Sequence, residues 1–163
     1  MKRGVVPGTF DPLTSGHLDI IERASAIFDE IVVGVALSPE KGGGPLFSIG
    51  ERVSLVERST AHCGNVSVRP FDTLLVNLAE DAGASVIVKG LRAVTDFERE
   101  FQMAALNWRL DSDIETMFIM AVPEYMYLSS SAVKEIARHG GSVRGLVPEH
   151  VAEALERKLN AAR

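Results

Sequence analysis

The sequence contains very little cysteine, no excess of positive charge and no long apolar run. Cys63 is the single cysteine in 163 residues, so an intramolecular disulfide is excluded, and no Cys/His spacing indicates a zinc site. No stretch of about 18 uninterrupted apolar residues occurs, which argues against a membrane span, and the N-terminus lacks the apolar segment of a signal peptide. We therefore predict a cytoplasmic protein, because a lone thiol suits a reducing compartment.

The charge balance argues against a nucleic-acid partner. The 22 Asp and Glu residues outnumber the 17 Lys and Arg residues, which gives a net charge of −5 and a pI near 5.4. Proteins that bind nucleic acids generally need a basic surface that neutralises phosphates, so we expect no nucleic-acid ligand here. The 46% hydrophobic and 24% charged residues are typical of a globular protein, and the length predicts one domain over residues 1–163.

The apolar residues alternate between two periodicities along the chain. Short runs rich in β-branched residues, typical of buried strands, occupy residues 5–6, 31–37, 66–68, 86–88 and 114–122. Helical spacing separates them, at residues 18–28, 53–60, 74–82 and 97–110, and a last helix is expected over 148–161. This alternation predicts an α/β fold, a Rossmann-like doubly wound parallel sheet of about five strands with helices on both faces.

Capping signals support several of these helix boundaries. Ser48 with Glu51, and Thr95 with Glu98, match the box in which a hydroxyl and a carboxylate satisfy the free amides of a helix start. Pro148 is expected at the first position of the last helix, where proline is tolerated.

The first strand is followed by the segment PGTFDPLTSGH, residues 7–17. Gly8 permits a tight turn, and Thr14 or Ser15 can cap the helix that follows. The exposed amides and the helix dipole there could hold a phosphate, although the segment matches neither G-x-G-x-x-G nor the Walker pattern. From these residues alone, a plain strand-to-helix turn is favoured over a phosphate site.

Three further segments follow strand ends, where parallel sheets bind ligands. Lys41 precedes three glycines and is either a solvated lysine or a cation that closes on a phosphate. Lys89 and Arg92 flank Gly90 and either converge on one anion or are surface charges. Glu100 could contact ribose hydroxyls or offset this basic pair. Capping explains one serine of the Ser129–Ser131 run, and the surplus hydroxyls could bind a phosphate chain.

Three blocks of the sequence resemble one family. PGTFDPLTSGH is similar to the T-x-G-H signature of nucleotidyltransferases, and VKGLRAVTDFERE and LSSSAVKE resemble two further blocks of bacterial phosphopantetheine adenylyltransferases. The resemblance covers nearly the whole chain, from about residue 3 to residue 159. It implies a Rossmann-like fold that converts ATP and 4'-phosphopantetheine into dephospho-coenzyme A and pyrophosphate with Mg²⁺, in a homohexamer.

The resemblance also implies a set of site residues, position by position. Those implied to contact ATP are Thr9, Phe10, His17, Gly90, Leu91, Arg92, Glu100, Tyr125, Met126, Tyr127, Leu128, Ser129, Ser130 and Ser131. Those implied to contact 4'-phosphopantetheine are Thr9, Lys41, Leu75 and Lys89. Lysine at position 89, where many relatives carry arginine, keeps the charge but loses the bidentate guanidinium fork.

The implied reaction is a direct displacement at the α-phosphorus of ATP. The attacking phosphate is already an anion, so no general base is required, and no Ser-His-Asp or Cys-His arrangement is present. We therefore expect His17, with Thr9 and Lys41, to stabilise the transition state, and His17 to act as a neutral donor at a helix N-terminus. No carboxylate cluster marks a protein-bound metal, so Mg²⁺ is expected to arrive with ATP.

Two other functions stay open from the sequence. The T-x-G-H motif also occurs in enzymes that transfer a nucleotide to other acceptors, such as cytidylyl or nicotinamide-mononucleotide adenylyl transferases. A nucleotide-binding sensor could keep the fold without catalysis. Retention of His17, Lys41, Lys89 and Arg92 together favours an enzyme, because a sensor has no need of groups that handle reacting phosphates.

Overall fold

The computed structural model describes residues 1–37, 44–92 and 94–161, and of residues 94–96 the backbone alone. Five parallel strands form one sheet in the order β3-β2-β1-β4-β5. They are β1 (Arg3–Gly8), β2 (Glu30–Ala36), β3 (Val66–Phe71), β4 (Val86–Leu91) and β5 (Glu115–Met120). This confirms the predicted Rossmann-like parallel sheet.

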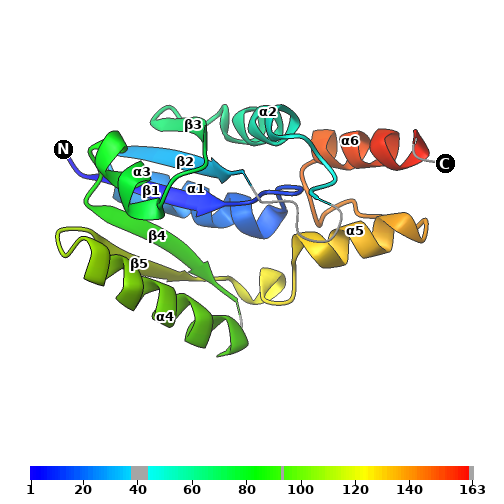
Figure 1. Cartoon of the computed structure of the whole chain (residues 1–163). Helices are drawn as coiled ribbons and strands as arrows, with labels where there is room; N and C mark the ends of the chain where they lie inside the picture. Colours follow the sequence, from blue (N-terminus) through cyan, green and yellow to red (C-terminus); the bar gives the residue numbers. More distant parts are fainter. Residues whose placement is uncertain (38–43, 93, 162–163) are drawn as a thin grey trace.

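Helices connect the strands and cover both faces of the sheet (Figure 1). They are α1 (Ser15–Ile27), α2 (Ile49–Thr60), α3 (Leu75–Ala82), α4 (Val94–Leu110), the 3₁₀ turn η1 (Pro123–Tyr125), α5 (Ser130–Arg138) and α6 (Glu149–Asn160). Helices α1 and α2 pack on one face, and α3 and α4 on the other. Up to β5 the order of strands and helices is the one that the periodicities predict, and after β5 the chain forms η1 and α5 before the expected last helix.

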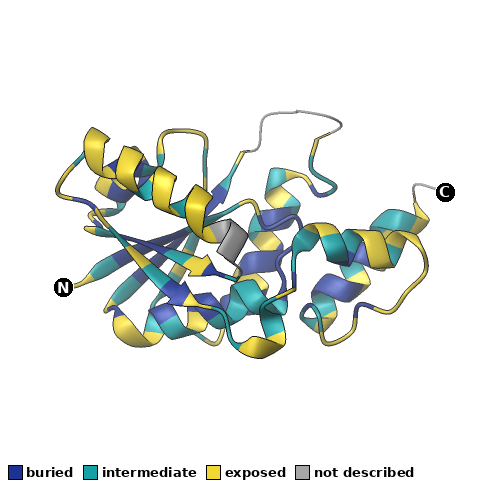
Figure 2. Cartoon of the chain, turned by 90° about the horizontal axis from the view of Figure 1, so that it is seen from below, coloured by how far each residue is buried: buried dark blue, intermediate teal, exposed yellow. Residues whose placement is uncertain are grey.

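Alternation along the strands creates two hydrophobic clusters, one on each face of the sheet. Val6 and Val33 pack toward α1, whereas their neighbours Val5 and Val32 pack toward α3. All four side chains are buried, and in Figure 2 the buried colour is concentrated on the inner strands and the exposed colour on the outer faces of the helices. Burial on both faces explains why these strands read as continuous apolar runs.

A third hydrophobic cluster lies beyond the carboxyl ends of the strands, where α5 and α6 pack together (Figure 1). It includes Val133, Val151 and Leu155, which are fully buried, and Phe47 from the connection that precedes α2. The sequence predicts the last helix and a helix start at the Ser129–Ser131 run but not this cluster, because helical spacing gives an apolar face without naming the surface that covers it.

Helix starts agree with the capping signals at two positions and differ at two. Thr14 and Ser48 are N-caps, and each accepts a hydrogen bond from the third residue of its helix. The prediction at Thr95 is wrong, because α4 already begins at Val94, so Thr95 lies inside the helix. Pro148 is an N-cap and not the first helical residue, since α6 begins at Glu149.

The strand order places a topological switch between β1 and β4. From β1 the chain passes through α1 to β2 on one side, and it returns through α3 to β4 on the other side of β1. The two strands end beside each other at Gly8 and Leu91. Ligands of open parallel sheets bind at such a point, because the diverging crossovers leave a crevice there.

Candidate active site

A cavity of about 470 Å³ opens at the carboxyl ends of β1 and β4. Its wall includes residues from strand ends and connections far apart in the sequence: Pro7–Phe10 at the end of β1, Lys89, Gly90 and Arg92 at the end of β4, Tyr125 in η1, and Leu128–Ser131 at the start of α5. The volume suits a small organic ligand of nucleotide size. Three of the four strand-end segments predicted from the sequence therefore meet in one wall.

His17 combines a structural role with a place in this wall. Its Nδ1 accepts a hydrogen bond from the backbone N–H of Thr14 at 3.1 Å, while the N–H of His17 donates to the Thr14 hydroxyl at 3.3 Å. The pair is thus a capping box with histidine in the place usually taken by glutamate. Because a backbone amide can only donate, Nδ1 is unprotonated, and the ring proton of neutral His17 is on Nε2.

The charge state of His17 follows from its surroundings. Burial and the nearby cations Arg92 and Lys89 lower the pKa of His17 to about 4. Both effects disfavour the imidazolium, as the helix N-terminus also does. The ring is therefore neutral at physiological pH, and its role as a donor to a substrate stays a prediction.

Positive side chains dominate the charged part of the cavity wall. Lys89, Arg92 and Arg99 line it together with one described carboxylate, that of Glu100. The ammonium of Lys89 lies 3.1 Å from the Glu100 carboxylate, and both side chains are about three-quarters buried. Arg92 donates to the carbonyl of Leu128 at 2.7 Å and so ties β4 to the segment before α5. Glu100 offsets one of these three cations, so the charged part of the wall stays net positive and favours an anionic ligand.

Each serine of the Ser129–Ser131 run has a different environment. Ser129 caps α5 and accepts from the amide of Ala132 at 3.1 Å. Ser130 donates to the carbonyl of Pro12 at 2.8 Å, which joins α5 to the T-x-G-H segment. Ser131 is exposed and lines the cavity. Capping thus explains one serine, as predicted, and the surplus is divided between a structural contact and the wall.

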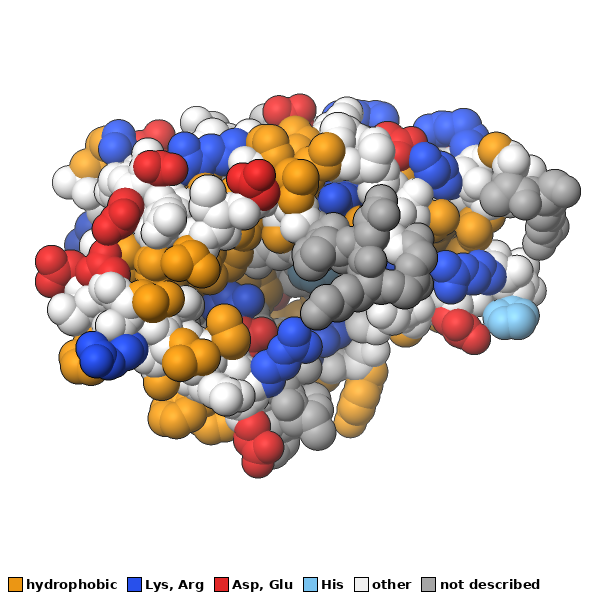
Figure 3. All heavy atoms as spheres, viewed as in Figure 1, with side chains coloured by type: hydrophobic (Ala, Val, Ile, Leu, Met, Phe, Trp, Pro, Cys, Tyr) orange, Lys and Arg blue, Asp and Glu red, His pale blue; other side chains and the backbone are white. Residues whose placement is uncertain are grey.

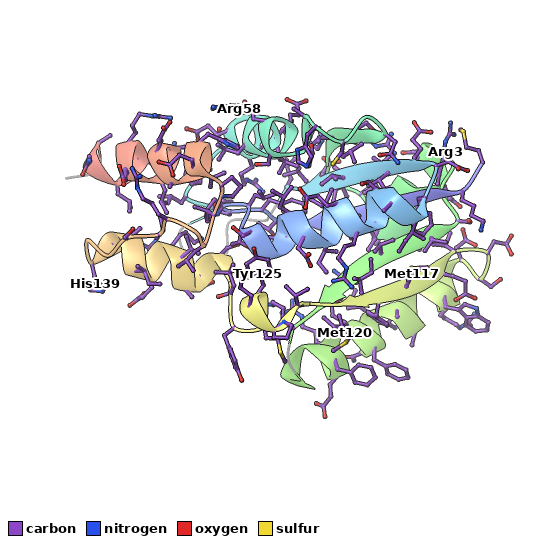
Figure 4. The ribbon with its side chains drawn as sticks, turned by 180° about the vertical axis from the view of Figure 1, so that it is seen from behind. Arg3, Arg58, Met117, Met120, Tyr125 and His139 are labelled. Atoms are coloured by element: carbon purple, nitrogen blue, oxygen red, sulfur yellow. The ribbon has the colours of Figure 1, made fainter. Side chains whose placement is uncertain are left out.

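Tyr125 closes the cavity beside the start of α1 (Figure 4). A Cβ atom at Gly16 would lie only 3.2 Å from the Tyr125 Cβ, so the absence of a side chain at Gly16 allows this close approach. Burial raises the pKa of the Tyr125 phenol, and the carboxylates of Glu124, Asp19 and Glu22 raise it further. The aromatic side chain is therefore an uncharged wall for the ligand.

Comparison with known proteins decides the family. Residues 5–136 match the cytidylyltransferase-like family model. The chain is 51% identical over 160 residues to the phosphopantetheine adenylyltransferase of Clostridium tetani (strain Massachusetts / E88), covering 98% of this chain and 99% of that protein. It is 54% identical over 162 residues to the enzyme of the same name from Caulobacter sp. (strain K31), with the same coverage. The chain belongs to the phosphopantetheine adenylyltransferase family.

Most residues that the family resemblance implied lie in the cavity wall. These are Thr9, Phe10, His17, Lys89, Gly90, Arg92, Glu100, Tyr125, Leu128, Ser129, Ser130 and Ser131. Four others are outside it: Leu91 is in the core, Leu75 is the first residue of α3 and packs against the hydrophobic cluster on that face, Met126 is half-buried and Tyr127 is almost fully exposed. Lys41 lies outside the described residues. The ligand contacts of all these residues, inside and outside the wall, stay predictions.

Sequence reasoning missed two buried charged groups beneath the wall. Asp11 accepts hydrogen bonds from the amides of Leu46 and Phe47 and from the ammonium of Lys134, which is 2.6 Å away. Burial by itself raises the pKa of Asp11, but these three donors outweigh it, so the pKa is below its usual range. The second group, Arg52, donates to three backbone carbonyls of the described residues. In the sequence each resembles an ordinary loop or helix charge.

Two other kinds of feature are absent from the described part of the chain. Among the residues that the structure describes, no group of three or more His, Cys, Asp and Glu side chains is placed to hold a metal ion. In the same residues, no helix is long and apolar enough to cross a membrane.

Proposed function

We propose that the cavity binds ATP and 4'-phosphopantetheine and transfers the adenylyl group to the phosphopantetheine phosphate. The products are dephospho-coenzyme A and pyrophosphate, in the penultimate step of coenzyme A biosynthesis. One observation supports this above all: a neutral histidine with its proton on Nε2 lies beside Lys89 and Arg92 at the switch point of the sheet. Family membership supplies the reaction class, and the site supplies groups that suit it.

The reaction we propose is an in-line displacement. A phosphate oxygen of phosphopantetheine attacks the α-phosphorus of ATP, a P–O bond forms, and the bond to the pyrophosphate leaving group breaks. The attacking oxygen is already anionic, so the protein need not remove a proton. Its task is to align two anions and offset their repulsion, and alignment can lower the barrier by about 7 to 11 kcal/mol in favourable cases.

The residues divide this task by their chemistry. His17 donates from Nε2 to an oxygen of the five-coordinate α-phosphate, whose charge grows in the transition state. Lys89 and Arg92 neutralise the reacting phosphates, and Glu100 holds the Lys89 ammonium in place between turnovers. Thr9 contacts both substrates from the end of β1, and we assign Lys41 to the same phosphates on the strength of the family resemblance alone.

Mg²⁺ enters this proposal with the nucleotide. Glu100 is the carboxylate in the described part of the wall, and it is paired with Lys89, so these residues do not fit a metal site of the protein's own. We infer that ATP phosphates and water hold the ion, the arrangement usual for Mg²⁺, and that it screens negative charge. No step of the mechanism depends on a protein ligand to it.

We also propose that the enzyme is a cytoplasmic homohexamer. Large apolar side chains are exposed along α4, among them Phe101 at 59% and Leu106 at 50%, and Figure 3 shows hydrophobic side chains gathered over this helix. Exposed apolar patches of this kind mark protein interfaces. Sedimentation should give about six times the chain mass of 17.6 kDa, and Leu106→Glu should lower it. A monomer at enzyme concentrations used in assays would reject the hexamer.

The experiment that tests the function is a pyrophosphate-release assay with paired substrates. ATP and CTP are each combined with 4'-phosphopantetheine, with nicotinamide mononucleotide and with no acceptor. Release only from ATP with 4'-phosphopantetheine is expected. Release with another pair would support transfer to a different acceptor, and ATP binding without release in any pair would support the nucleotide sensor; both would overturn the proposal.

A further inference from the structure

Arg52 is an almost fully buried cation with no described carboxylate in contact. The residue is 2% exposed and extends from the first turn of α2 toward the carboxyl ends of β1 and β2. Its Nη1 donates to the carbonyls of Thr9 and Ala36, both at 2.8 Å, and its Nε donates to the carbonyl of Phe47 at 3.2 Å. One guanidinium thus joins three chain segments that meet beneath the cavity.

Burying a guanidinium is costly unless its donors are satisfied. Burial lowers the pKa of Arg52, and the charge of Asp11 partly opposes this effect. A planar fork of donors can reach several carbonyls in fixed directions, which a lysine ammonium cannot do. An apolar side chain would remove the charge but leave three carbonyls without this donor. Position 52 therefore requires a side chain that donates several hydrogen bonds in fixed directions, which core packing alone does not explain.

The contact with Thr9 sets the direction of a particular peptide. In a trans peptide the N–H points opposite to the preceding carbonyl, so an Arg52 bond to the Thr9 carbonyl turns the Phe10 N–H away from α2. Phe10 has φ of 50°, in the left-handed region that non-glycine residues rarely occupy. Such a conformation costs about 1 to 3 kcal/mol and persists only where the surrounding structure imposes it.

The conformation of Phe10 places its ring against the reaction centre. The ring meets the imidazole of His17 edge to face, with 5.2 Å between ring centroids and 76° between planes. It also lies directly on Gly8, where an added Cβ would be 2.7 Å from the tip of the ring. Phe10 is 3% exposed, so this packing fixes one side of the His17 imidazole.

On these contacts we propose that Arg52 is a positioning residue for adenylyl transfer: it orients the Thr9–Phe10 peptide, and through the Phe10 ring it holds the His17 imidazole. Asp11, one residue beyond Phe10, is fixed independently by Lys134 and by the amides of Leu46 and Phe47. The strained residue is thus held on both sides by buried charges. This role rests on the proposed function for its effect on rate, but not for its effect on the histidine.

The test combines kinetics with a signal from the histidine itself. Arg52→Met keeps the length of the side chain and removes all three donors, and Arg52→Lys keeps the charge but not the fork. Arg69→Met is the matched control, because Arg69 also donates to a backbone carbonyl, that of Leu78 at 2.9 Å, and does not line the cavity. In each protein the ring-proton shifts of ¹³C-labelled His17 are recorded without ligands, and kcat and KM are measured with both substrates.

We expect kcat to fall about 100-fold in Arg52→Met, the usual effect of a small misplacement of reacting groups, with ATP affinity changed less than about threefold. The His17 ring protons should lose the shift caused by the Phe10 ring, and Arg69→Met should change neither quantity. If Arg52→Met does not fold, Arg52→Lys is measured instead, and we expect the same changes in kcat and in the His17 shifts with smaller magnitude. A folded variant with unchanged kcat, or with unchanged His17 shifts, would overturn the role. If the wild-type protein has no transferase activity while the His17 shifts still move in the variant, the proposed function is rejected instead.

Discussion

Replacement of His17 by alanine separates binding from catalysis at this site. The substitution removes the Nε2 donor, and removing one donor aimed at developing charge typically costs about 2.7 to 4 kcal/mol, or a factor of about 100 to 1,000 in kcat. It also removes the acceptor of the Thr14 amide, which lies 3.1 Å from Nδ1. Loss of this cap should lower the stability of the fold by about 1 kcal/mol.

These two effects predict different measurements. Single-turnover pyrophosphate release should slow by the full factor, while ATP affinity, measured by calorimetry, should change little because the donor acts mainly on the transition state. The pKa of about 4 adds a pH criterion: wild-type kcat should show no step from His17 between about pH 5 and 8. His62→Ala is the control, since His62 is an exposed histidine paired with Glu22.

Two results would refute this reasoning. Turnover of His17→Ala within about threefold of wild type would remove His17 from the transition state. A loss of rate that appears only as the pH falls through about 6.5, and that is absent from the variant, would show that His17 titrates as an ordinary histidine.

Three further changes have defined outcomes. Asp11→Asn should lower the free energy of unfolding by about 3 kcal/mol in urea at neutral pH. Because the pKa of Asp11 is below its ordinary 3.8, this loss should be full above about pH 4 and shrink as the pH falls further; a constant loss down to pH 2 would contradict it. Gly8→Ala should displace the Phe10 ring and reduce kcat at least about tenfold, whereas unchanged kinetics would show that the ring tolerates movement. Lys89→Met should raise the KM for 4'-phosphopantetheine about tenfold or more and leave the acceptor-independent binding of ATP weaker but measurable; an unaffected KM would place Lys89 outside the substrate site.

The sequence predicts the sheet well because its signals are local. Val5 and Val6, or Val32 and Val33, have to be apolar on both sides of a covered parallel strand, and this requirement is visible in any short window. The position of the site follows from the same signals, since the strand ends mark the edge where loops converge. The family resemblance then supplied roles that spacing alone left open.

The sequence does not predict the buried charges of the site, because their partners lie far away along the chain. Asp11 meets Lys134 across 123 positions, and Arg52 meets Thr9 across 43, so no local pattern marks either as buried. The pairing of Glu100 with Lys89 is likewise apparent from the folded structure and not from a local pattern. Thr95 shows the opposite error, in which a good local signal for a helix start is overridden because α4 begins at Val94.

Because α5 and α6 pack in a hydrophobic cluster of their own, the site lies between two separately packed parts of the chain, the sheet with its helices and the α5–α6 cluster. The Asp11–Lys134 ion pair and the Ser130–Pro12 hydrogen bond cross from one part to the other beside the cavity. A nucleotide that contacts both walls adds a temporary link of the same kind. Bound nucleotide should therefore slow amide hydrogen exchange in α5 and α6. The slowing should grow with the ratio of ligand concentration to Kd.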